Sequence, residues 1–160
     1  MKEKKAIKEA FTELAPRYEK VVDNELHKFW GWSYYKFIEN LVINTPIGYS
    51  DVILDGATGT GLIPRKLREF GRNVRIVGID ITFAMLKNGN AIISADPKEK
   101  KMYFTTGDAM QMPFRPDYFN VVMSGLATHH MNVPVLLAEI LRVLKPGGLF
   151  SLADVGGTRL

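Results

Sequence analysis

The chain has no cysteine among its 160 residues, which excludes disulfide bridges and thiolate metal ligands. Histidine is scarce as well, with three residues, so a metal site is not expected. No apolar run approaches the ~20 residues that a membrane-spanning helix needs, and the Lys-rich N-terminus lacks the apolar core of a signal peptide. These absences predict a soluble protein of the cytoplasm with no membrane span.

A strong excess of one charge is also lacking. Lysine and arginine number 21, against 17 aspartates and glutamates. The lysines bunch at the N-terminus and again at Lys98, Lys100 and Lys101, a distribution more typical of solvated segments than of a nucleic-acid-binding face. We therefore expect a small-molecule partner and no nucleic acid.

Helical patterns fill the first part of the chain. Ile7, Phe11 and Leu14 recur on one face of a helix that is expected to end near Pro16. A second helix is expected over residues 30–42. This second region is rich in aromatic side chains, which either line a pocket for an apolar or planar substrate or pack the helix on a sheet: Phe29, Trp30, Trp32, Tyr34, Tyr35 and Phe37.

From Asp51 onward, short apolar runs rich in β-branched residues alternate with helical patterns. The runs lie at 52–54, 74–79, 102–105, 120–123 and 149–152, and the helical patterns at 62–70, 83–93 and 133–144. Strands that are buried on both faces and joined by helices form a parallel sheet with right-handed crossovers. The predicted class is therefore α/β, a doubly wound, mainly parallel sheet with helices on both faces. Residues 146–148, Pro-Gly-Gly, are interpreted as the last helix stop and the turn into the last strand.

A glycine-rich stretch directly follows the first predicted strand. Residues 52–55, Val-Ile-Leu-Asp, lead into residues 56–61, Gly-Ala-Thr-Gly-Thr-Gly, and a helix is expected from Leu62. Small residues let the backbone approach a ligand, and the amides of a helix start attract a carboxylate or phosphate. A nucleotide-like ligand with an anionic group is expected at this edge of the sheet. A structural strand-to-helix turn uses the same residue types, so the loop alone does not identify the ligand.

Two other glycine loops are disfavoured by the residues that follow. A phosphate-binding P-loop needs Gly-Lys-Ser/Thr, whereas Gly61 is followed by Leu62 and Ile63. A dinucleotide fingerprint needs glycine or alanine three residues after its second glycine, and counting from Gly59 and Gly61 that position is Pro64. A nicotinamide-dependent oxidoreductase is therefore a weaker interpretation.

Acidic residues also end the next two strands. Asp80 lies 19 positions after Gly61, a distance at which an acid can accept hydrogen bonds from both hydroxyls of a ribose. Asp108 ends the third strand, where it could receive the exocyclic amine of an adenine. The alternatives are a helix cap for Asp80 and a turn-stabilising role for Asp108. With Asp55, three successive strand ends carry an acid, which favours a ligand site.

The ordered set of these motifs resembles class I S-adenosylmethionine (SAM) dependent methyltransferases, most of all the ubiquinone/menaquinone-biosynthesis C-methyltransferase type. The resemblance runs from Val52 to Val155 and includes the glycine loop, Val77-Gly78-Ile79-Asp80-Ile81, Gly107-Asp108-Ala109 and the stretch from Glu139 to Gly148. It implies a Rossmann-like fold, SAM as cofactor, and methyl transfer to a small apolar or aromatic molecule. It also implies a division into a helical lid and acceptor-side segment, residues 1–50, and a SAM-binding core, residues 51–160.

The same resemblance implies which residues surround the cofactor. Asp55, Ala57, Gly59 and Gly61 would surround its methionine end, Asp80 the ribose, and Asp108 with Ala109 the adenine, while Ser124 would lie beside the methyl group and Tyr18 in the lid. Some acceptors also need a proton removed, and His129 and His130 are the candidates for a base near neutral pH. Packing or capping is the alternative role for this histidine pair.

The family fold has seven strands, whereas this chain ends at Leu160, a few residues after the fifth predicted strand. We expect strands six and seven to be absent and the fifth strand to expose an edge, which natural proteins usually cover. Either the chain is shortened or the edge pairs with a second copy or a partner chain. A non-catalytic SAM-fold module that binds a partner through this edge is therefore the alternative to an enzyme.

Overall fold

A computed structural model of the chain describes residues 2–93 and 102–156. Its five strands form one sheet, and all neighbouring strands run parallel. The strands are β1 (Val52–Gly56), β2 (Arg75–Asp80), β3 (Met102–Thr106), β4 (Phe119–Gly125) and β5 (Leu144–Ala153). They are ordered β3-β2-β1-β4-β5, so the chain winds outward from β1 in both directions.

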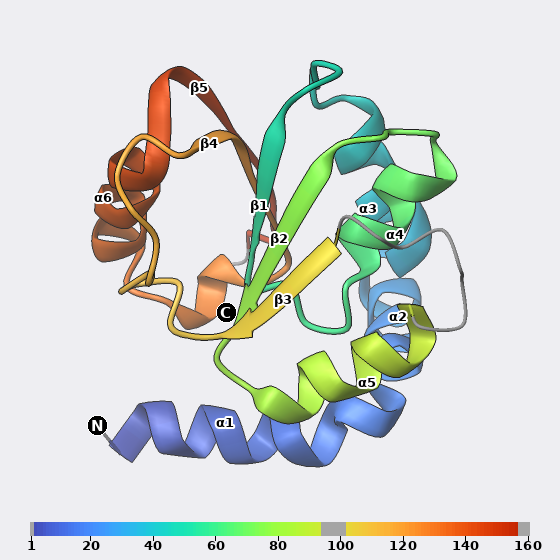
Figure 1. Cartoon of the computed structure of the whole chain (residues 1–160). Helices are drawn as coiled ribbons and strands as arrows, with labels where there is room; N and C mark the ends of the chain where they lie inside the picture. The colour runs from blue at the N-terminus through green and yellow to red at the C-terminus, as the bar shows by residue number, and fades with distance from the viewer. Residues whose placement is uncertain (1, 94–101, 157–160) are drawn as a thin grey trace.

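Helices cover both faces of this sheet (Figure 1). They are α1 (Lys2–Leu14), α2 (Tyr18–Trp30), α3 (Tyr34–Ile43), α4 (Leu62–Glu69), α5 (Phe83–Ile93) and α6 (Val133–Val143), with short 3-10 turns η1 (Ala15–Arg17) and η2 (Thr128–His130). Helices α3, α4 and α5 lie on one side of the sheet and α6 on the other, while α1 crosses the carboxyl edge of the strands. The predicted α/β class, with a doubly wound parallel sheet, is confirmed.

Two cores, one on each face, hold these layers together. Side chains alternate between faces along a strand, so Ile53 and Ile76 join the core under α3 and α4, while Leu54 and Ile79 join the core under α6. All four are fully buried. The sheet is therefore sealed on both sides near β1, and its carboxyl edge is where polar groups can reach a ligand.

The N-terminal helices differ from the expectation. The helix predicted at 30–42 begins later, at Tyr34, because Gly31 takes a left-handed φ of 70° and ends the preceding helix α2 at Trp30. The next helix starts at Tyr34, whose N–H donates to the Asp23 carboxylate at 2.8 Å. Ser33 donates its hydroxyl to the same carboxylate at 3.1 Å. Helix α2 itself was not predicted, and it adds a thirteen-residue element beside α3.

The Pro-Gly-Gly segment is the second correction. Helix α6 ends at Val143 and β5 begins at the next residue, so residues 146–148 lie inside the strand instead of before it. The register shows why: Leu144 pairs with Phe119 but Leu149 pairs with Val121, which leaves extra residues on β5. Such an irregularity is a bulge, and glycine supplies the positive φ of 76° found at residue 147.

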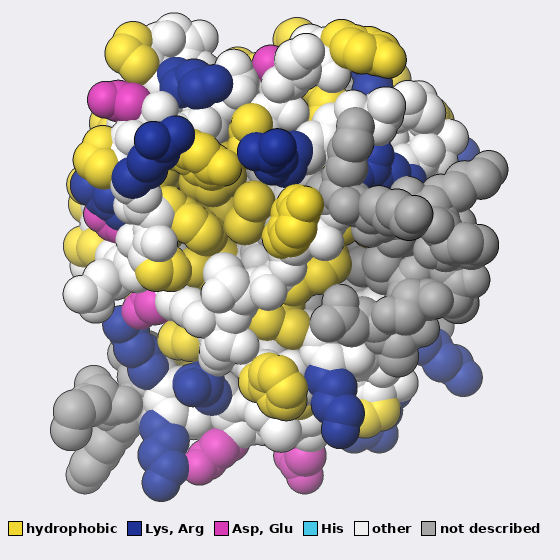
Figure 2. All heavy atoms as spheres, viewed as in Figure 1, with side chains coloured by type: hydrophobic (Ala, Val, Ile, Leu, Met, Phe, Trp, Pro, Cys, Tyr) yellow, Lys and Arg dark blue, Asp and Glu magenta, His cyan; other side chains and the backbone are white. Residues whose placement is uncertain are grey.

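Several surface expectations can be compared with the structure. Among the six aromatic residues of the second region, Tyr34 is buried, whereas the exposed ones are Phe29, Trp30, Trp32 and Tyr35. Within the described residues β5 pairs only with β4, as expected of an open edge. Figure 2 shows a further group of apolar side chains on the face turned to the viewer. Tyr103 of β3 is also exposed. The lysines at 98, 100 and 101 lie outside the described residues, and no described helix is long and apolar enough to cross a membrane.

Candidate functional site

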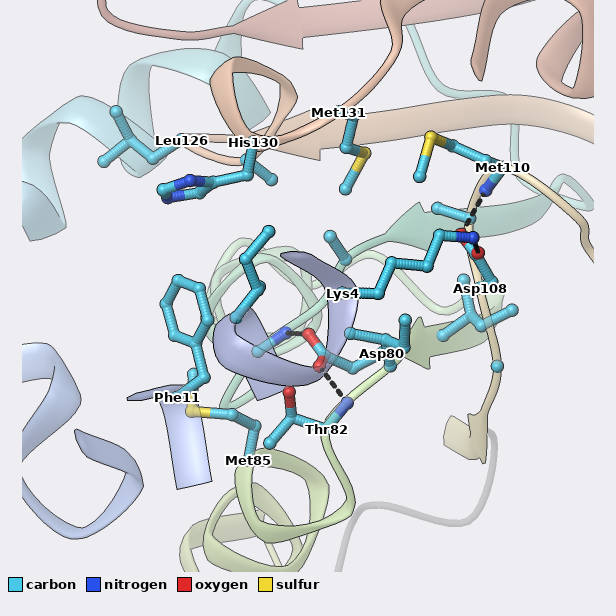
Figure 3. Close-up of a pocket in the computed structure, with 18 of the residues that line it drawn as sticks. Lys4, Phe11, Asp80, Thr82, Met85, Asp108, Met110, Leu126, His130 and Met131 are labelled. Carbon is cyan, nitrogen blue, oxygen red and sulfur yellow. Dashed lines mark hydrogen bonds and ion pairs between the residues drawn. The ribbon is translucent and has the colours of Figure 1, made fainter. Parts of the chain in front are cut away.

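A cavity of about 760 Å³, counted with its open mouth, lies at the carboxyl ends of the strands. Its walls come from the segments that follow β1, β2, β3 and β4 and from helix α1, which contributes Lys4, Ile7 and Phe11. Figure 3 shows these side chains around the space. Strand β1 has β2 on one side and β4 on the other, so the cavity lies at the point of the sheet where ligands of doubly wound proteins bind.

Asp80, the last residue of β2, is the carboxylate at the centre of this cavity. Its Oδ2 accepts a hydrogen bond from the Gly59 N–H at 2.9 Å, and its Oδ1 accepts one from the Thr82 N–H at 2.8 Å. Burial raises its pKa, and these backbone bonds oppose the rise. A carboxylate offers about four acceptor positions, so the side chain keeps capacity for a ligand. The bond to Thr82 resembles the predicted helix cap. Capping the helix therefore leaves Asp80 able to bind a ligand as well.

The glycine loop is held in a tight left-handed path. Gly59 and Gly61 have φ of 57° and 80°, and Ala57 adopts a φ of 60°, which is unusual for a residue with a side chain. Helix α5 packs directly on the loop, because a Cβ added to Gly89 would lie 2.5 Å from the backbone oxygen of Thr60. The loop is therefore fixed by backbone packing before any ligand arrives.

Asp55 is buried beneath the loop, beside a second and smaller cavity that Tyr18 and Tyr34 also line. Its Oδ2 accepts a hydrogen bond from the Thr58 hydroxyl at 2.5 Å, whereas its Oδ1 is buried without a partner. Loss of water raises the pKa of Asp55 to about 7, although the Thr58 bond lowers it. An unpartnered carboxylate oxygen of this kind attracts a cation or a hydrogen-bond donor.

Asp108 follows β3 and faces the cavity from the opposite side. Its Oδ1 accepts the Met110 N–H at 2.8 Å, which is the turn contact expected of an aspartate there. Its Oδ2 forms an ion pair with the Lys4 ammonium at 2.5 Å, and Figure 3 shows Lys4 reaching across to it from α1. Next to it, a Cβ on Gly107 would lie 2.8 Å from the Ile79 side chain. Both Gly107 and Ile79 line the cavity.

The histidine pair lies in η2, after β4. His130 lines the cavity and meets the edge of the Phe11 ring, with ring centroids 5.4 Å apart. His129 points elsewhere: its Nδ1 lies 2.8 Å from Oδ1 of Asp154, the residue that follows β5. Burial lowers the pKa of His130, the neighbouring His129 lowers it further, and Asp154 opposes this. His130 therefore favours the neutral imidazole, which can accept a proton.

The structure brings most of the predicted site residues together. The larger cavity is lined by Tyr18, Ala57, Gly59, Asp80, Asp108 and Ala109, and the smaller one by Asp55. Two residues are placed elsewhere. Gly61 caps α4, and Ser124 is buried with its hydroxyl donating to the Gly56 carbonyl at 2.9 Å.

Other lining residues were missed as ligand contacts, although the apolar stripe that contains Ile7 and Phe11 was visible in the sequence. Lys4, Thr82 and Leu126 carried no sequence signal that separates them from ordinary surface or core residues. In the part of the chain that the structure describes, no three His, Asp or Glu side chains are grouped to hold a metal ion.

Comparisons with known proteins agree with this geometry. The profile of the methyltransferase domain family matches residues 54–152. A demethylmenaquinone methyltransferase of Symbiobacterium thermophilum is 32% identical over 146 residues, which are 90% of this chain and 57% of that protein. A 2-phytyl-1,4-naphtoquinone methyltransferase of Thermosynechococcus vestitus is 30% identical over 92% of this chain and 64% of its own length. The chain thus spans less than two thirds of these relatives.

Solved structures show the same fold. One chain of the complex between the Haloferax volcanii Trm112 methyltransferase activator and a methyltransferase matches 90% of this chain with a TM-score of 0.73 and 27% identity, over 59% of its own length. A methyltransferase of Bacillus halodurans matches 77% of this chain and 52% of its own length with a TM-score of 0.68 and 30% identity.

Proposed function

The chain belongs to the methyltransferase domain family, and we propose that it transfers a methyl group from SAM to a small aromatic molecule of the quinone type. The observation that carries the proposal is the Asp80 carboxylate, which the Gly59 and Thr82 amides hold inside the cavity. Such a carboxylate can accept hydrogen bonds from two ribose hydroxyls.

The residues at the carboxyl edge fit this cofactor. A flat purine can lie between apolar side chains that line the cavity, such as Ile79 and Ala109, with its amine toward the Asp108 carboxylate. Gly107, which has no side chain, lines the same part of the cavity. The buried oxygen of Asp55, which has no partner, suits the ammonium group of the methionine end, because a nearby cation would repay part of its desolvation.

When bound, SAM supplies a methyl group that its sulfonium makes electrophilic. The chain then has to hold the acceptor in line and keep water away. Phe11, Leu126 and Met131 offer apolar walls for this purpose at one side of the cavity, and Figure 3 shows them around the mouth. A planar, apolar ring fits such walls, and two relatives bear names of quinone methyltransferases.

His130 is the group we assign as proton acceptor. Methylation of a ring carbon in a hydroquinone releases one proton, and a neutral imidazole in the cavity can take it. The groups that face His130 are His129, Asp154 and the Phe11 ring. The Asp154 carboxylate holds His129 by a hydrogen bond with Nδ1 of that histidine. His130 is the member of the pair that lines the cavity.

Titration calorimetry with S-adenosylhomocysteine (SAH) tests the cofactor site. We expect saturable binding by the wild type and a dissociation constant about 10- to 100-fold larger for Asp80→Asn, because hydrogen bonds to a charged group are lost. Asp51→Asn is the matched control, since that carboxylate also accepts a backbone N–H, from Gly48, but precedes β1. Preference for NADH over SAH, or equal SAH binding by both variants, would refute the proposal.

A methyl-transfer assay with radiolabelled SAM and a naphthohydroquinone tests the assignment of His130. We expect His130→Gln to lower the turnover by about 100-fold or more while SAH binding stays as in the wild type. Equal turnover would exclude His130 as the proton acceptor. The alternative function, a non-catalytic module that binds a partner at the edge of β5, predicts no turnover by the wild type and is not favoured by the enzyme names of the relatives.

A further inference from the structure

A partly buried ion pair connects the first turn of α2 to the glycine loop. Oε1 of Glu19 accepts a hydrogen bond from the Thr60 hydroxyl at 2.6 Å and another from Nη2 of Arg65 at 2.6 Å. The side chains of Glu19 and Arg65 are each 16% exposed. Charge-assisted bonds in such a setting are stronger than exposed ones, because little water competes for the charges.

Arg65 binds Thr60 as well as Glu19. Its Nη1 donates to the backbone oxygen of Thr60 at 3.0 Å, while its Nη2 donates to Glu19. Thr60 is therefore held twice, at its hydroxyl by the carboxylate and at its carbonyl by the guanidinium. Its side chain is almost fully buried, so no water can replace either bond.

The held residue lies between the last two glycines of the loop. Thr60 stands between Gly59, whose N–H binds Asp80, and Gly61, whose N–H donates to the Thr58 carbonyl at 2.9 Å. Glycines lose the most conformational freedom on ordering, so an anchor between them determines where both amides point. Tyr18, the residue before Glu19, lines both cavities. One carboxylate thus sets the position of the loop and of the tyrosine that covers it.

We propose that Glu19 is a positioning residue for the cofactor site. It fixes Thr60 and Tyr18 relative to each other, so that the loop amides and the tyrosine ring surround the methionine end of SAM in one arrangement. The ligand in this proposal rests on the proposed function, whereas the coupling of α2 to the loop does not. Glu19 is bonded neither to Asp80, the carboxylate proposed to bind the ribose, nor to a predicted reacting atom. It acts through Thr60.

Two substitutions of Thr60 separate the hydroxyl from the packing. Thr60→Val keeps the volume and removes the donor to Glu19, and Thr60→Ser keeps the donor and removes a methyl group. We expect the SAH dissociation constant to rise about 10-fold in the valine variant and to change less than about 2-fold in the serine variant. Glu19→Gln should weaken binding as well, and Glu25→Gln on the exposed side of α2 is its control.

Amide hydrogen exchange, measured without ligand, tests whether α2 is coupled to the glycine loop. Removing the anchor should speed amide exchange at residues 59–61 in Thr60→Val and Glu19→Gln, and leave exchange in β4 and β5 unchanged. A purely structural role would instead lower the melting temperature and leave SAH affinity unaltered at a temperature where each variant is folded. Unchanged exchange at Gly59 in a folded Thr60→Val or Glu19→Gln variant overturns the proposal. Failure of the wild type to bind SAH refutes the proposed function, and the exchange result still decides this inference.

Discussion

Two walls of the same cavity are built in different ways. The glycine loop is tightly packed on the side away from the cavity, with Thr58 and Thr60 buried and α5 in backbone contact. Helix α1 covers the opposite wall, yet none of its described side chains is fully buried, and its contacts with the site come from Lys4, Ile7 and Phe11. The wall beside Asp80 is therefore preorganised, whereas the cover beside Asp108 is placed by few contacts.

This difference arises because polar groups of the loop are buried away from water, whereas those of α1 stay hydrated. In the loop, the buried carboxylates of Asp55 and Asp80 accept hydrogen bonds from Thr58, Gly59 and Thr82, so a shift of the loop breaks several bonds together. In α1 the polar groups face solvent, and a shift exchanges protein contacts for water at little cost. Local opening is expected at the weakly packed element first.

The largest expected effect is on the unfolding free energy as a function of pH. It tests the packed wall of the cavity, which is formed by the glycine loop at residues 56–61. Burial raises the pKa of Asp55 from 3.8 to about 7, so between about pH 4 and pH 7 the folded protein keeps a proton that the unfolded chain has released. The unfolding free energy therefore falls as pH rises through this window, by roughly 1.4 kcal/mol for each unit of the pKa shift. Asp55→Asn removes this loss.

Urea unfolding at pH 4 and pH 8 measures the effect. The variant should gain stability relative to the wild type as pH rises, and the gain should be complete by pH 8. Asp51→Asn, whose carboxylate is at a turn before β1, is the control and should run parallel to the wild type. Parallel curves for Asp55→Asn and the wild type would mean that Asp55 is hydrated in the folded protein.

Gly89→Ala should disturb the packing of the glycine loop and have the next largest effect on the unfolding free energy. In an open helix this change gains up to about 1 kcal/mol, but here the new Cβ would lie 2.5 Å from the Thr60 oxygen and 2.7 Å from its carbonyl carbon. Both neighbours are backbone atoms, so the loop or α5 must move. We expect the unfolding free energy to fall by about 1–3 kcal/mol.

The same variant should bind SAH more weakly, because the displaced Thr60 carries the amides at Gly59 and Gly61 with it. Urea unfolding and calorimetry measure the two effects. Gly156→Ala is the control, since nothing lies within 4 Å of its added Cβ. A stability gain in Gly89→Ala would show that α5 does not press on the loop.

The packed wall was the part that could be predicted from the sequence. Parallel strands end at one edge, so Asp55, Asp80 and Asp108 at successive strand ends had to converge there. The loop was recognisable because its glycines are adjacent in the chain. The pairings of Glu19 with Arg65 and of Lys4 with Asp108 join residues 46 and 104 positions apart, and no local pattern predicts such partners.

The errors lie among the local signals that were misread. Gly31 marks the end of α2, but the aromatic residues on both sides suggested one continuous helix. The Pro-Gly-Gly segment suggested a turn because these residues commonly end helices, and a bulge inside β5 uses the same positive φ at Gly147. In both cases a glycine with a positive φ interrupts an element at a place that the predicted boundaries missed.

Lys4→Met tests the loose wall and should have the smallest effect on stability. The Lys4 side chain is 54% exposed, and exposed ion pairs contribute no more than about 1 kcal/mol. Its effect on binding should run in the opposite direction, because Oδ2 of Asp108 becomes free for the adenine amine. We expect the SAH dissociation constant to fall about 3-fold, with Lys5→Met on the same helix as the control, a lysine that pairs with Glu9 at 3.8 Å. Weaker binding by Lys4→Met would instead mean that the ion pair holds α1 closed over the ligand, and that both walls are built to retain it.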